Sequence, residues 1–258
     1  MEKLKGIGVF SDIVFGKGFV WKNFFLLSQE YKIPKKDIKE EINKLDEAIK
    51  KTIEEITALK KNLEESIGKE YADIFNFHLS ILQDKNLRDE TVKIIKEEQL
   101  NVESSLKKVI FKLGEIFGKS EKDFLKDRRR DILDVVEKIV SNLKDIPSMK
   151  VIGEGEIIVA DDLSPSQIVA LNRKLVKGIV TDIGSETSHI AIMVRALEIP
   201  SVIGVGEATK VIKTGDGLIV DGEEGIVIVN PTNKVINEYK KKKKDLKKKR
   251  KKISLLKN

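Results

Sequence analysis

The chain has 258 residues, of which 40% are apolar and 35% are charged, so it can bury one large core or two modest ones. It contains no cysteine, which excludes a disulfide scaffold, a thiolate metal site and a cysteine nucleophile. Aromatic residues make up 5%, which argues against a stacking surface for single-stranded nucleic acid. No apolar run approaches the ~20 residues of a membrane span, and glycines interrupt residues 1–18, so we expect a cytoplasmic protein without a secretory signal.

The net charge of +7 is distributed unevenly along the chain. Residues Lys240 to Lys252 hold eleven Lys or Arg and one acid, a net of +10, which leaves the remaining residues at −3. The body of the protein is therefore mildly acidic, and the positive charge is concentrated in a tail at residues 240–252. This pattern is more typical of an exposed helix than of a nucleic-acid-binding body.

Glycines and β-branched residues in 1–20 predict one or two short strands. Apolar residues then recur every three or four positions from Pro34 to Gly68, which predicts a long amphipathic helix with proline near its start and glycine just past its end. Further runs with the same period predict four more helices, so residues 34–146 are expected to form a helical bundle with short connections.

Beyond residue 150 the apolar pattern changes to short β-branched runs. They predict strands at Glu156–Ala160, Gly178–Thr181, Ser201–Val205, Leu218–Val220 and Ile226–Val229. Helices are expected between them at 165–175 and 188–198, the first with Ser164 as its N-cap, followed by Pro165 and Gln167.

These patterns predict an α/β domain, which the strands of 1–20 join and which an all-α helical bundle interrupts. The predicted domains are therefore a discontinuous α/β domain (1–20 and 147–231), a helical subdomain (34–146) and a basic linker helix (232–258).

His189 is one of two histidines, and its context favours chemistry. It follows a loop of small polar residues after a strand that ends near Thr181, and it lies in the first turn of an apolar helix that Pro200 terminates. In α/β sheets, ligands gather at the carboxyl ends of strands. The free N–H groups and positive dipole of a helix N-terminus also favour an anion.

A neutral imidazole has a nitrogen lone pair that can attack phosphorus and later release the phosphoryl group. No lysine or carboxylate pair is placed as a rival nucleophile. The hydroxyls of Thr187 and Ser188 either cap the helix or hold phosphate oxygens, and the residues alone leave both roles open. Taken by themselves, the residues predict an anion-handling histidine.

Residues Thr187–Gly204 closely resemble the phosphohistidine signature of the phosphoenolpyruvate-utilising enzymes. Residues Val159–Ser166, Val229–Thr232 and Gly6–Val9, together with the helical insertion, resemble the enzyme I family of the bacterial phosphoenolpyruvate:sugar phosphotransferase system. The resemblance covers residues 1 to about 245.

The resemblance implies that His189 takes a phosphoryl group from phosphoenolpyruvate and passes it to a histidine of HPr, a small phosphocarrier protein. It places the phosphoenolpyruvate and Mg²⁺ site in a C-terminal barrel of about 250 residues, so we expect this chain to be the N-terminal half, with no metal site or cofactor of its own. Such a chain would exchange phosphate with HPr without phosphorylating itself, and it is expected to be monomeric.

The resemblance also implies that the helical subdomain docks HPr. On pattern alone His78 borders a core face, and Arg128 belongs to a solvated charge run. Position-matching assigns the docking surface to Glu70, His78, Ile81, Phe117, Leu125 and Arg128.

Three positions depart from the family pattern. Glu186 stands where a basic or small residue is usual, Ile168 where a threonine that hydrogen-bonds the histidine ring is common, and Lys69 where the family often has an acid. They bear on transfer rate and HPr specificity.

Two other hypotheses compete with this one. The first is a swivelling phosphohistidine domain of a pyruvate phosphate dikinase or phosphoenolpyruvate synthase relative, which lacks such a helical insertion. The second is a non-enzymatic helical interaction protein whose lysine tail binds nucleic acid, which leaves the Thr-Ser-His helix start without a purpose.

Overall fold

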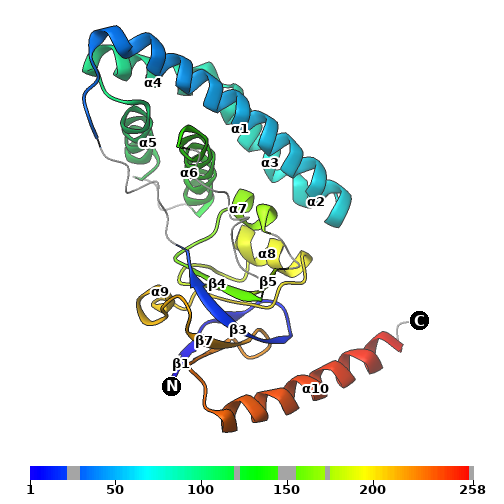
Figure 1. Ribbon diagram of the computed structural model, residues 1–258. Coiled ribbons are helices and arrows are strands. Elements are labelled where there is room, and N and C mark those ends of the chain that lie inside the picture. The colour runs from blue at the N-terminus through cyan, green and yellow to red at the C-terminus, as the bar shows by residue number, and fades with distance from the viewer. Residues whose placement is uncertain (22–29, 119–122, 145–154, 172–174, 256–258) are drawn as a thin grey trace. The chain divides into compact units, whose positions relative to one another are not determined.

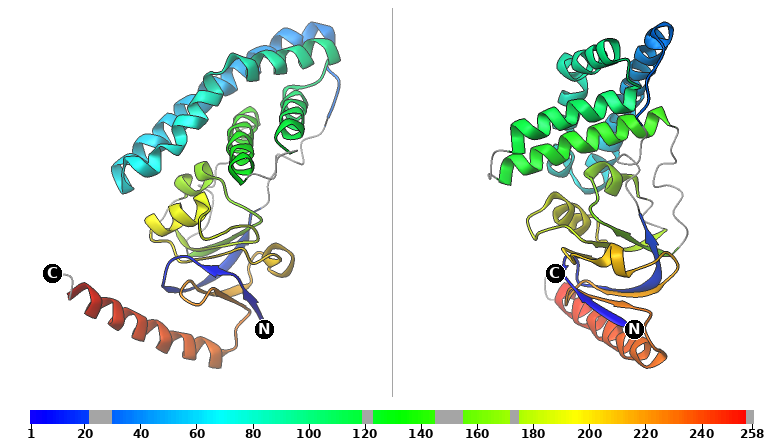
Figure 2. Two further views of the ribbon diagram at one scale, coloured as in Figure 1. Left: turned by 180° about the vertical axis from the view of Figure 1, so that it is seen from behind. Right: turned by 90° about the vertical axis from the view of Figure 1, so that its left-hand side faces the viewer.

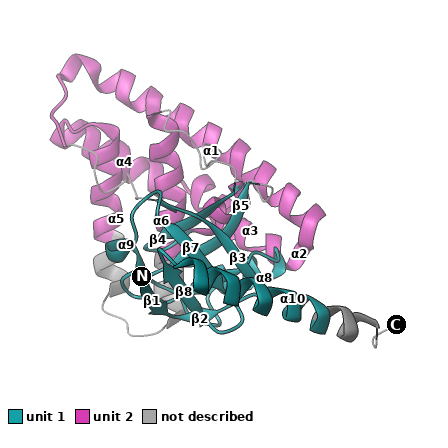
Figure 3. Cartoon of the chain, turned by 60° about the horizontal axis from the view of Figure 1, so that its bottom comes forward, with its two compact units in different colours: residues 1–22, 149–163, 171–258 teal, residues 23–148, 164–170 magenta. Residues whose placement is uncertain are grey.

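The structure, a computed structural model, describes residues 1–21, 30–118, 123–144, 155–171 and 175–255, with side chains for all of these except 113–118, 123–129 and 250–255. The chain divides into two compact units. The α/β unit comprises residues 1–22, 149–163 and 171–258, and the helical unit comprises residues 23–148 and 164–170 (Figure 3). The predicted fold class, an α/β fold interrupted by helices, is confirmed.

The α/β unit is built on an eight-stranded sheet in the order β1-β8-β7-β3-β4-β5-β6-β2. Figure 1 labels β3, β4, β5 and β7 of this sheet. Strands β3 to β6 are parallel neighbours, and the remaining pairs are antiparallel. The strands are β1 (Glu2–Lys5), β2 (Ile7–Gly8), β3 (Ile13–Val20), β4 (Glu156–Ala160), β5 (Val176–Thr181), β6 (Ser201–Ile203), β7 (Gly217–Asp221) and β8 (Ile226–Val229). The strands expected from residues 1–20 do join this sheet.

The first eight residues pair with both ends of the sheet. β1 pairs with β8, with Leu4 opposite Val227, and β2 pairs with β6, with Ile7 opposite Ile203. Gly6 lies between the two strands, and a Cβ there would lie 2.6 Å from the Ile203 carbonyl oxygen. Glycine is needed at this position because the backbones approach too closely for any side chain.

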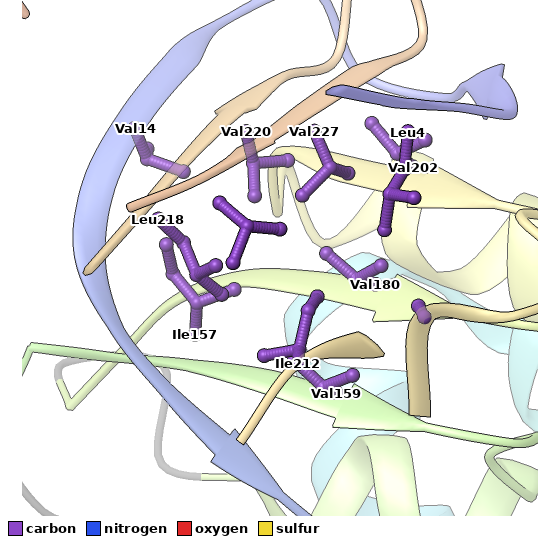
Figure 4. Packing of buried hydrophobic residues seen from close by; sticks show 12 residues of the cluster. Leu4, Val14, Ile157, Val159, Val180, Val202, Ile212, Leu218, Val220 and Val227 are labelled. Carbon is purple, nitrogen blue, oxygen red and sulfur yellow. The ribbon is translucent and has the colours of Figure 1, made fainter. Parts of the chain in front are cut away.

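Alternate residues of the strands form the core of the sheet. Val14, Ile157, Val180 and Val202 come from four neighbouring strands and are buried together with Leu4 of β1 (Figure 4). One apolar cluster therefore receives side chains from strands that are far apart in the sequence, as expected for a sheet that is strongly curved.

The C-terminal helix α10 (Asn233–Leu255) packs on the α/β unit. Leu246 is buried in a cluster with Ile13, Ile219 and Ile228, and Lys242 Nζ lies 2.5 Å from a carboxylate oxygen of the fully buried Asp221. The sequence sets residues 232–258 apart as a linker because lysine dominates them. The structure places them in the α/β unit because one face of the helix supplies apolar and ion-pair contacts.

The helical unit is organised around α1 (Ile38–Ile67), which contacts each of the helices α2 to α7. Figure 2 shows this long helix from two further sides. The other helices are α2 (Lys69–Ala72), α3 (Ile74–Gln83), α4 (Lys85–Glu98), α5 (Val102–Gly118), α6 (Asp123–Leu143) and α7 (Pro165–Ala170), and a 3₁₀ turn, η2 (Lys35–Asp37), precedes α1. Among the residues described here, no helix is both long and apolar enough to cross a bilayer.

Glu41 is buried on the apolar side of α1, which its sequence does not predict. One carboxylate oxygen accepts from the Val102 backbone N–H at 3.0 Å, at the start of α5, and the other accepts from Lys44 at 2.9 Å. The ion pair and hydrogen bonds raise the pKa of Lys44. A buried carboxylate of α1 thus satisfies an otherwise unpaired N–H group at the start of another helix.

Helix α7 lies between β4 and β5 in the sequence but groups with the helical unit. The predicted helix start is confirmed: Ser164 N–H donates to Gln167 Oε1 at 2.9 Å, and Gln167 N–H donates to Ser164 Oγ at 3.3 Å, a reciprocal capping box. The helix ends at Ala170, earlier than the predicted residue 175. The sequence also predicts a capping box for the helix that starts at Ser120, with Asp123 as the partner, but Ser120 lies outside the described residues.

We expect Leu246→Ala to lower the free energy of unfolding of the α/β unit by about 2 kcal/mol, because it removes a buried side chain between α10 and the sheet. Denaturant unfolding followed by the fluorescence of Trp21, the one tryptophan of the chain, measures the effect. The exposed neighbour Lys247→Ala is the matched control and should shift stability by less than about 0.5 kcal/mol. Equal stability of the two variants would show that α10 does not pack on the sheet.

Candidate active site

The candidate site lies at the carboxyl ends of two parallel strands. β4 ends at Ala160 and β5 at Thr181, and these residues are in register. The chain after β5 continues this pairing, because Asp182 N–H donates to the Ala160 carbonyl at 3.1 Å and Ile183 N–H donates to the Asp161 carbonyl at 2.8 Å. The loop that leads to His189 therefore starts from a firmly held backbone.

Asp182 fixes the other side of this loop. Its buried carboxylate accepts from the backbone N–H of Ala208, and from both the backbone N–H and the hydroxyl of Thr209, at the start of α9 (Ala208–Val211). An acid directly after a buried strand is the one signal in the sequence for such a role. The sequence did not identify Asp182, because its partners lie 26 and 27 residues away.

Ser188 is the N-cap of α8 (His189–Ala196). Its hydroxyl oxygen accepts from the Ala191 backbone N–H at 3.3 Å, and the hydroxyl donates to the Ser185 carbonyl at 2.7 Å. Of the two roles that the sequence leaves open for this side chain, the structure shows the cap. Thr187 is exposed, so its hydroxyl faces solvent.

His189 is the first residue of α8 and is exposed. The following residues Ile190, Ala191, Met193 and Val194 are buried and anchor the helix on the sheet. Within the α/β unit, the described residues provide no hydrogen-bond partner for the His189 ring. Among the described residues of this unit, the imidazole thus has no hydrogen-bond partner, and it lies at the N-terminus of a well-packed helix. An in-line attack on an incoming phosphorus atom needs this arrangement.

The surroundings of His189 combine a charge with apolar side chains. Glu186 is exposed, so the acid that departs from the family pattern is solvated. Ile183 and Ile192 are each 40% exposed, and they belong to a group of five large apolar residues that are exposed among the described side chains. Ile192 lies three residues after His189, on the same face of α8.

The residues expected to dock a protein partner differ in how much of their side chains is exposed. Glu70 is exposed on α2 and Ile81 is half-buried on α3. The side chains of Phe117, Leu125 and Arg128 lie outside the described residues.

His78 corrects the expectation of an exposed docking residue. Its side chain is 0% exposed, because it packs in the helical unit against Asp134 of α6. A docked protein therefore finds no surface of His78 to contact. The sequence pattern alone, which placed His78 beside a core face, agrees better with the structure than the resemblance does.

No group of three or more His, Cys, Asp or Glu side chains that could hold a metal ion occurs among the described residues. Ile168 is buried in α7 at 1% exposure, where an apolar side chain fits.

Comparisons with known proteins agree with this geometry. Two family profiles match the chain: PEP-utilising enzyme, N-terminal, over residues 5–128, and PEP-utilising enzyme, mobile domain, over residues 152–225. The helical unit and the histidine-bearing unit therefore each match a part of the same class. The fold and the two profile matches place the chain in the class of PEP-utilising enzymes.

Individual relatives narrow the class. The phosphoenolpyruvate-protein phosphotransferases of Bacillus subtilis (strain 168) and Geobacillus stearothermophilus are 38% and 36% identical, over 94% and 93% of this chain and 42% of each relative. An NMR solution structure of Enzyme I (nEIt) has a TM-score of 0.72 at 36% identity and covers 95% of this chain and 99% of that one. An N-terminal domain of Enzyme 1 - Nitrogen has a TM-score of 0.67 at 27% identity and covers 92% and 98%.

The chain belongs to the Enzyme I family and matches the N-terminal part of the phosphoenolpyruvate-protein phosphotransferases. It spans 42% of the length of the two curated relatives described above.

We expect Ser188→Ala to lower the free energy of unfolding of the α/β unit by about 1 kcal/mol, because the first turn of α8 loses its N-cap. Unfolding followed by Trp21 fluorescence measures the change. Ser185→Ala is the matched control, since the structure uses the backbone carbonyl of Ser185 and leaves its exposed side chain without a described contact. If Ser185→Ala destabilised the unit as much, the cap would not be the source of the effect.

Proposed function

We propose that His189 is phosphorylated and carries a phosphoryl group from phosphoenolpyruvate to the histidine of HPr, the first step of the sugar phosphotransferase system. The observation that carries this proposal is the exposed imidazole, which has no hydrogen-bond partner among the described residues of its unit, on a capped helix that follows the carboxyl end of β5. Family membership supports it, because this chain matches the part of Enzyme I that includes a mobile domain.

The reaction needs one unprotonated ring nitrogen. Its lone pair attacks phosphorus, an N–P bond forms, and the P–O bond to the enolate of pyruvate breaks with its electron pair on that oxygen. Protonation of the enolate gives pyruvate. In the second transfer the histidine of the carrier attacks the same phosphorus, the N–P bond to His189 breaks, and the neutral imidazole is restored.

The start of α8 favours the phosphoryl group electrostatically. A helix N-terminus stabilises an anion by about 0.3–1 kcal/mol, or up to ~2 kcal/mol when partly buried. That amount orients a phosphoryl group without making the phosphohistidine bond, so the donor must supply the energy of the bond. The exposed Thr187 hydroxyl is placed to donate to a phosphate oxygen, whereas Ser188 is engaged as the cap.

We propose two surfaces for the carrier. Ile192, three residues after His189 on α8, and Ile183, in the loop that leads to α8, are exposed apolar side chains, which suit the apolar core of a protein interface. The helical unit adds Glu70, Ile81, Phe117, Leu125 and Arg128. His78 is no longer part of this surface because it is buried.

The donor site is proposed to lie in the part of the relatives that this chain does not match. We assign the Mg²⁺ site to that same part, as the family resemblance implies, and no step above passes through the ion. We therefore expect this chain, as a monomer, to exchange phosphate with HPr but not to take it directly from phosphoenolpyruvate.

His189→Ala should abolish labelling of the chain by phosphorylated HPr, because it removes the attacking nitrogen. The measurement is transfer of radiolabelled phosphate, with Lys247→Ala, at an exposed position of α10, as the control that keeps His189. Full labelling of His189→Ala would refute the site.

Incubation of the unaltered chain with labelled phosphoenolpyruvate and Mg²⁺ alone should leave it unlabelled, and incorporation there would show that the donor site has been misplaced.

Arg128→Glu should weaken HPr binding by roughly tenfold, because it reverses a charge in the proposed docking surface. Calorimetric titration measures the affinity, and circular dichroism checks that the helices remain folded. Lys39→Glu is the charge-matched control: it lies at the start of α1, about 45 Å along that helix from the end that precedes Glu70. Unchanged affinity of Arg128→Glu would remove this residue from the interface.

A further inference from the structure

The buried side chain of His78 forms two hydrogen bonds inside the helical unit. Its Nδ1 lies 2.9 Å from the Ile74 carbonyl oxygen of the same helix, and its Nε2 lies 3.1 Å from Asp134 Oδ2 on α6. Both side chains are shielded from solvent, with exposures of 0% for His78 and 2% for Asp134.

Both partners of the ring are acceptors. A carbonyl oxygen has no proton to donate, and an ionised carboxylate has none either. A neutral imidazole would leave one unprotonated nitrogen facing an oxygen lone pair in a dry interior. The geometry is satisfied when both nitrogens carry hydrogen, that is, when His78 is an imidazolium ion paired with Asp134.

The same carboxylate holds the start of α7. Asp134 Oδ1 accepts from the Ser166 hydroxyl at 2.5 Å, and Asp134 Oδ2 accepts from the Ser166 backbone N–H at 3.1 Å. Ser166 is the second residue of α7, so this N–H is one of the groups that a helix cannot satisfy internally. The attachment of α7 to the helical unit thus depends on an ionised Asp134, which His78 keeps paired.

We propose that His78 is a positioning residue: as an imidazolium it pairs with Asp134 and thereby locks α7 onto the helical unit. Resting on the function proposed above, this lock couples carrier docking to transfer. Helix α7 is joined by peptide bonds to the α/β unit on both sides, at residues 163/164 and 170/171. A firmly held α7 reduces the number of conformations that the chain samples before a carrier docked on the helical unit meets His189.

The charges around His78 define the pH range of the lock. Burial disfavours the charged form of His78. Three groups outweigh burial and raise the pKa of His78 above its ordinary 6.5: Asp134, through its hydrogen bond and charge, the Ile74 carbonyl, and the charge of Asp131. Burial likewise opposes ionisation of Asp134, yet His78, Ser164 and Ser166 hold its pKa below the ordinary value. The stabilisation is present below pH 6.5 and is lost as pH rises through the raised pKa of His78; it is lost at the acidic end as Asp134 protonates.

Ring ¹⁵N chemical shifts test the charge state directly. The chain has two histidines, so the His189→Ala variant leaves His78 as the single ring signal. We expect both nitrogens of His78 to show imidazolium shifts at pH 6, and the midpoint of its titration to lie above 6.5. A neutral tautomer at pH 6 would overturn the proposal, whatever the function of His189.

Hydrogen exchange of the Ser166 amide tests the lock. His78→Gln keeps an N–H donor for Asp134 but carries no charge, and we expect its Ser166 amide to exchange about tenfold faster than in the unaltered chain at pH 6, with the difference shrinking as pH rises. Ser80→Ala, at an exposed position of α3, is the control. Ser166→Ala, which removes one hydroxyl and no charge, serves if His78→Gln does not fold, and should also loosen α7. Unchanged exchange in the folded variants would refute the lock.

Transfer kinetics test the positioning role. With phosphorylated HPr as donor, His78→Gln should lower kcat by about tenfold while KM stays within about twofold, because docking is kept and orientation is lost. A rise in KM with unchanged kcat would show that His78 serves docking instead. If even the unaltered chain accepts no phosphate, the proposed function fails, while the ring shifts and the Ser166 exchange still decide on the lock.

Discussion

The site depends on holding one histidine rigidly while leaving its ring in solvent. In the function proposed above, His189 must meet phosphorus on another molecule, so its ring cannot be buried, and a flexible ring would lose much of the benefit of orientation. The chain resolves this conflict with backbone and cap contacts below the ring: Asp182 and Ile183 extend the pairing of β4 and β5, and Ser188 closes the first turn of α8. The buried apolar residues of α8 then pack into the unit, while the His189 ring stays exposed and has no hydrogen-bond partner among the described residues of that unit.

Carboxylates at helix starts recur through the fold. Asp84 accepts from the Asn86 N–H and caps its own helix α4. In three other cases the acid comes from elsewhere in the chain: Glu41 serves α5, Asp134 serves α7 and Asp182 serves α9. Each of these acids is buried, and each accepts from backbone N–H groups that no intrahelical acceptor can reach. These contacts determine which elements pack together, beyond what apolar burial alone specifies.

The sequence predicts the elements well because their signals are local. The period of apolar residues in 38–67, the Ser164–Gln167 capping box and the strand Ile226–Val229 all depend on residues within a few positions of one another. The Thr-Ser-His motif likewise predicts the candidate site from neighbours in the chain. Glu41, Asp134 and Asp182 escape prediction because their partners lie 61, 32 and 26 residues away, and an isolated acid in a helical pattern is typical of a solvated face. His78 is misassigned for the same reason: only the fold shows that an acid of α6 meets it.

The pairing of β1 with β8 affects how the protein folds during its synthesis on the ribosome. Glu2 lies opposite Val229, so β1 has no β8 partner until about 220 further residues have been made. The helices of 38–143 are local structures and can form while synthesis continues, whereas the sheet must wait for β7 and β8. Strand β1 is thus made well before it can pair, and a nascent chain stalled before residue 226 would expose an unpaired strand edge to aggregation.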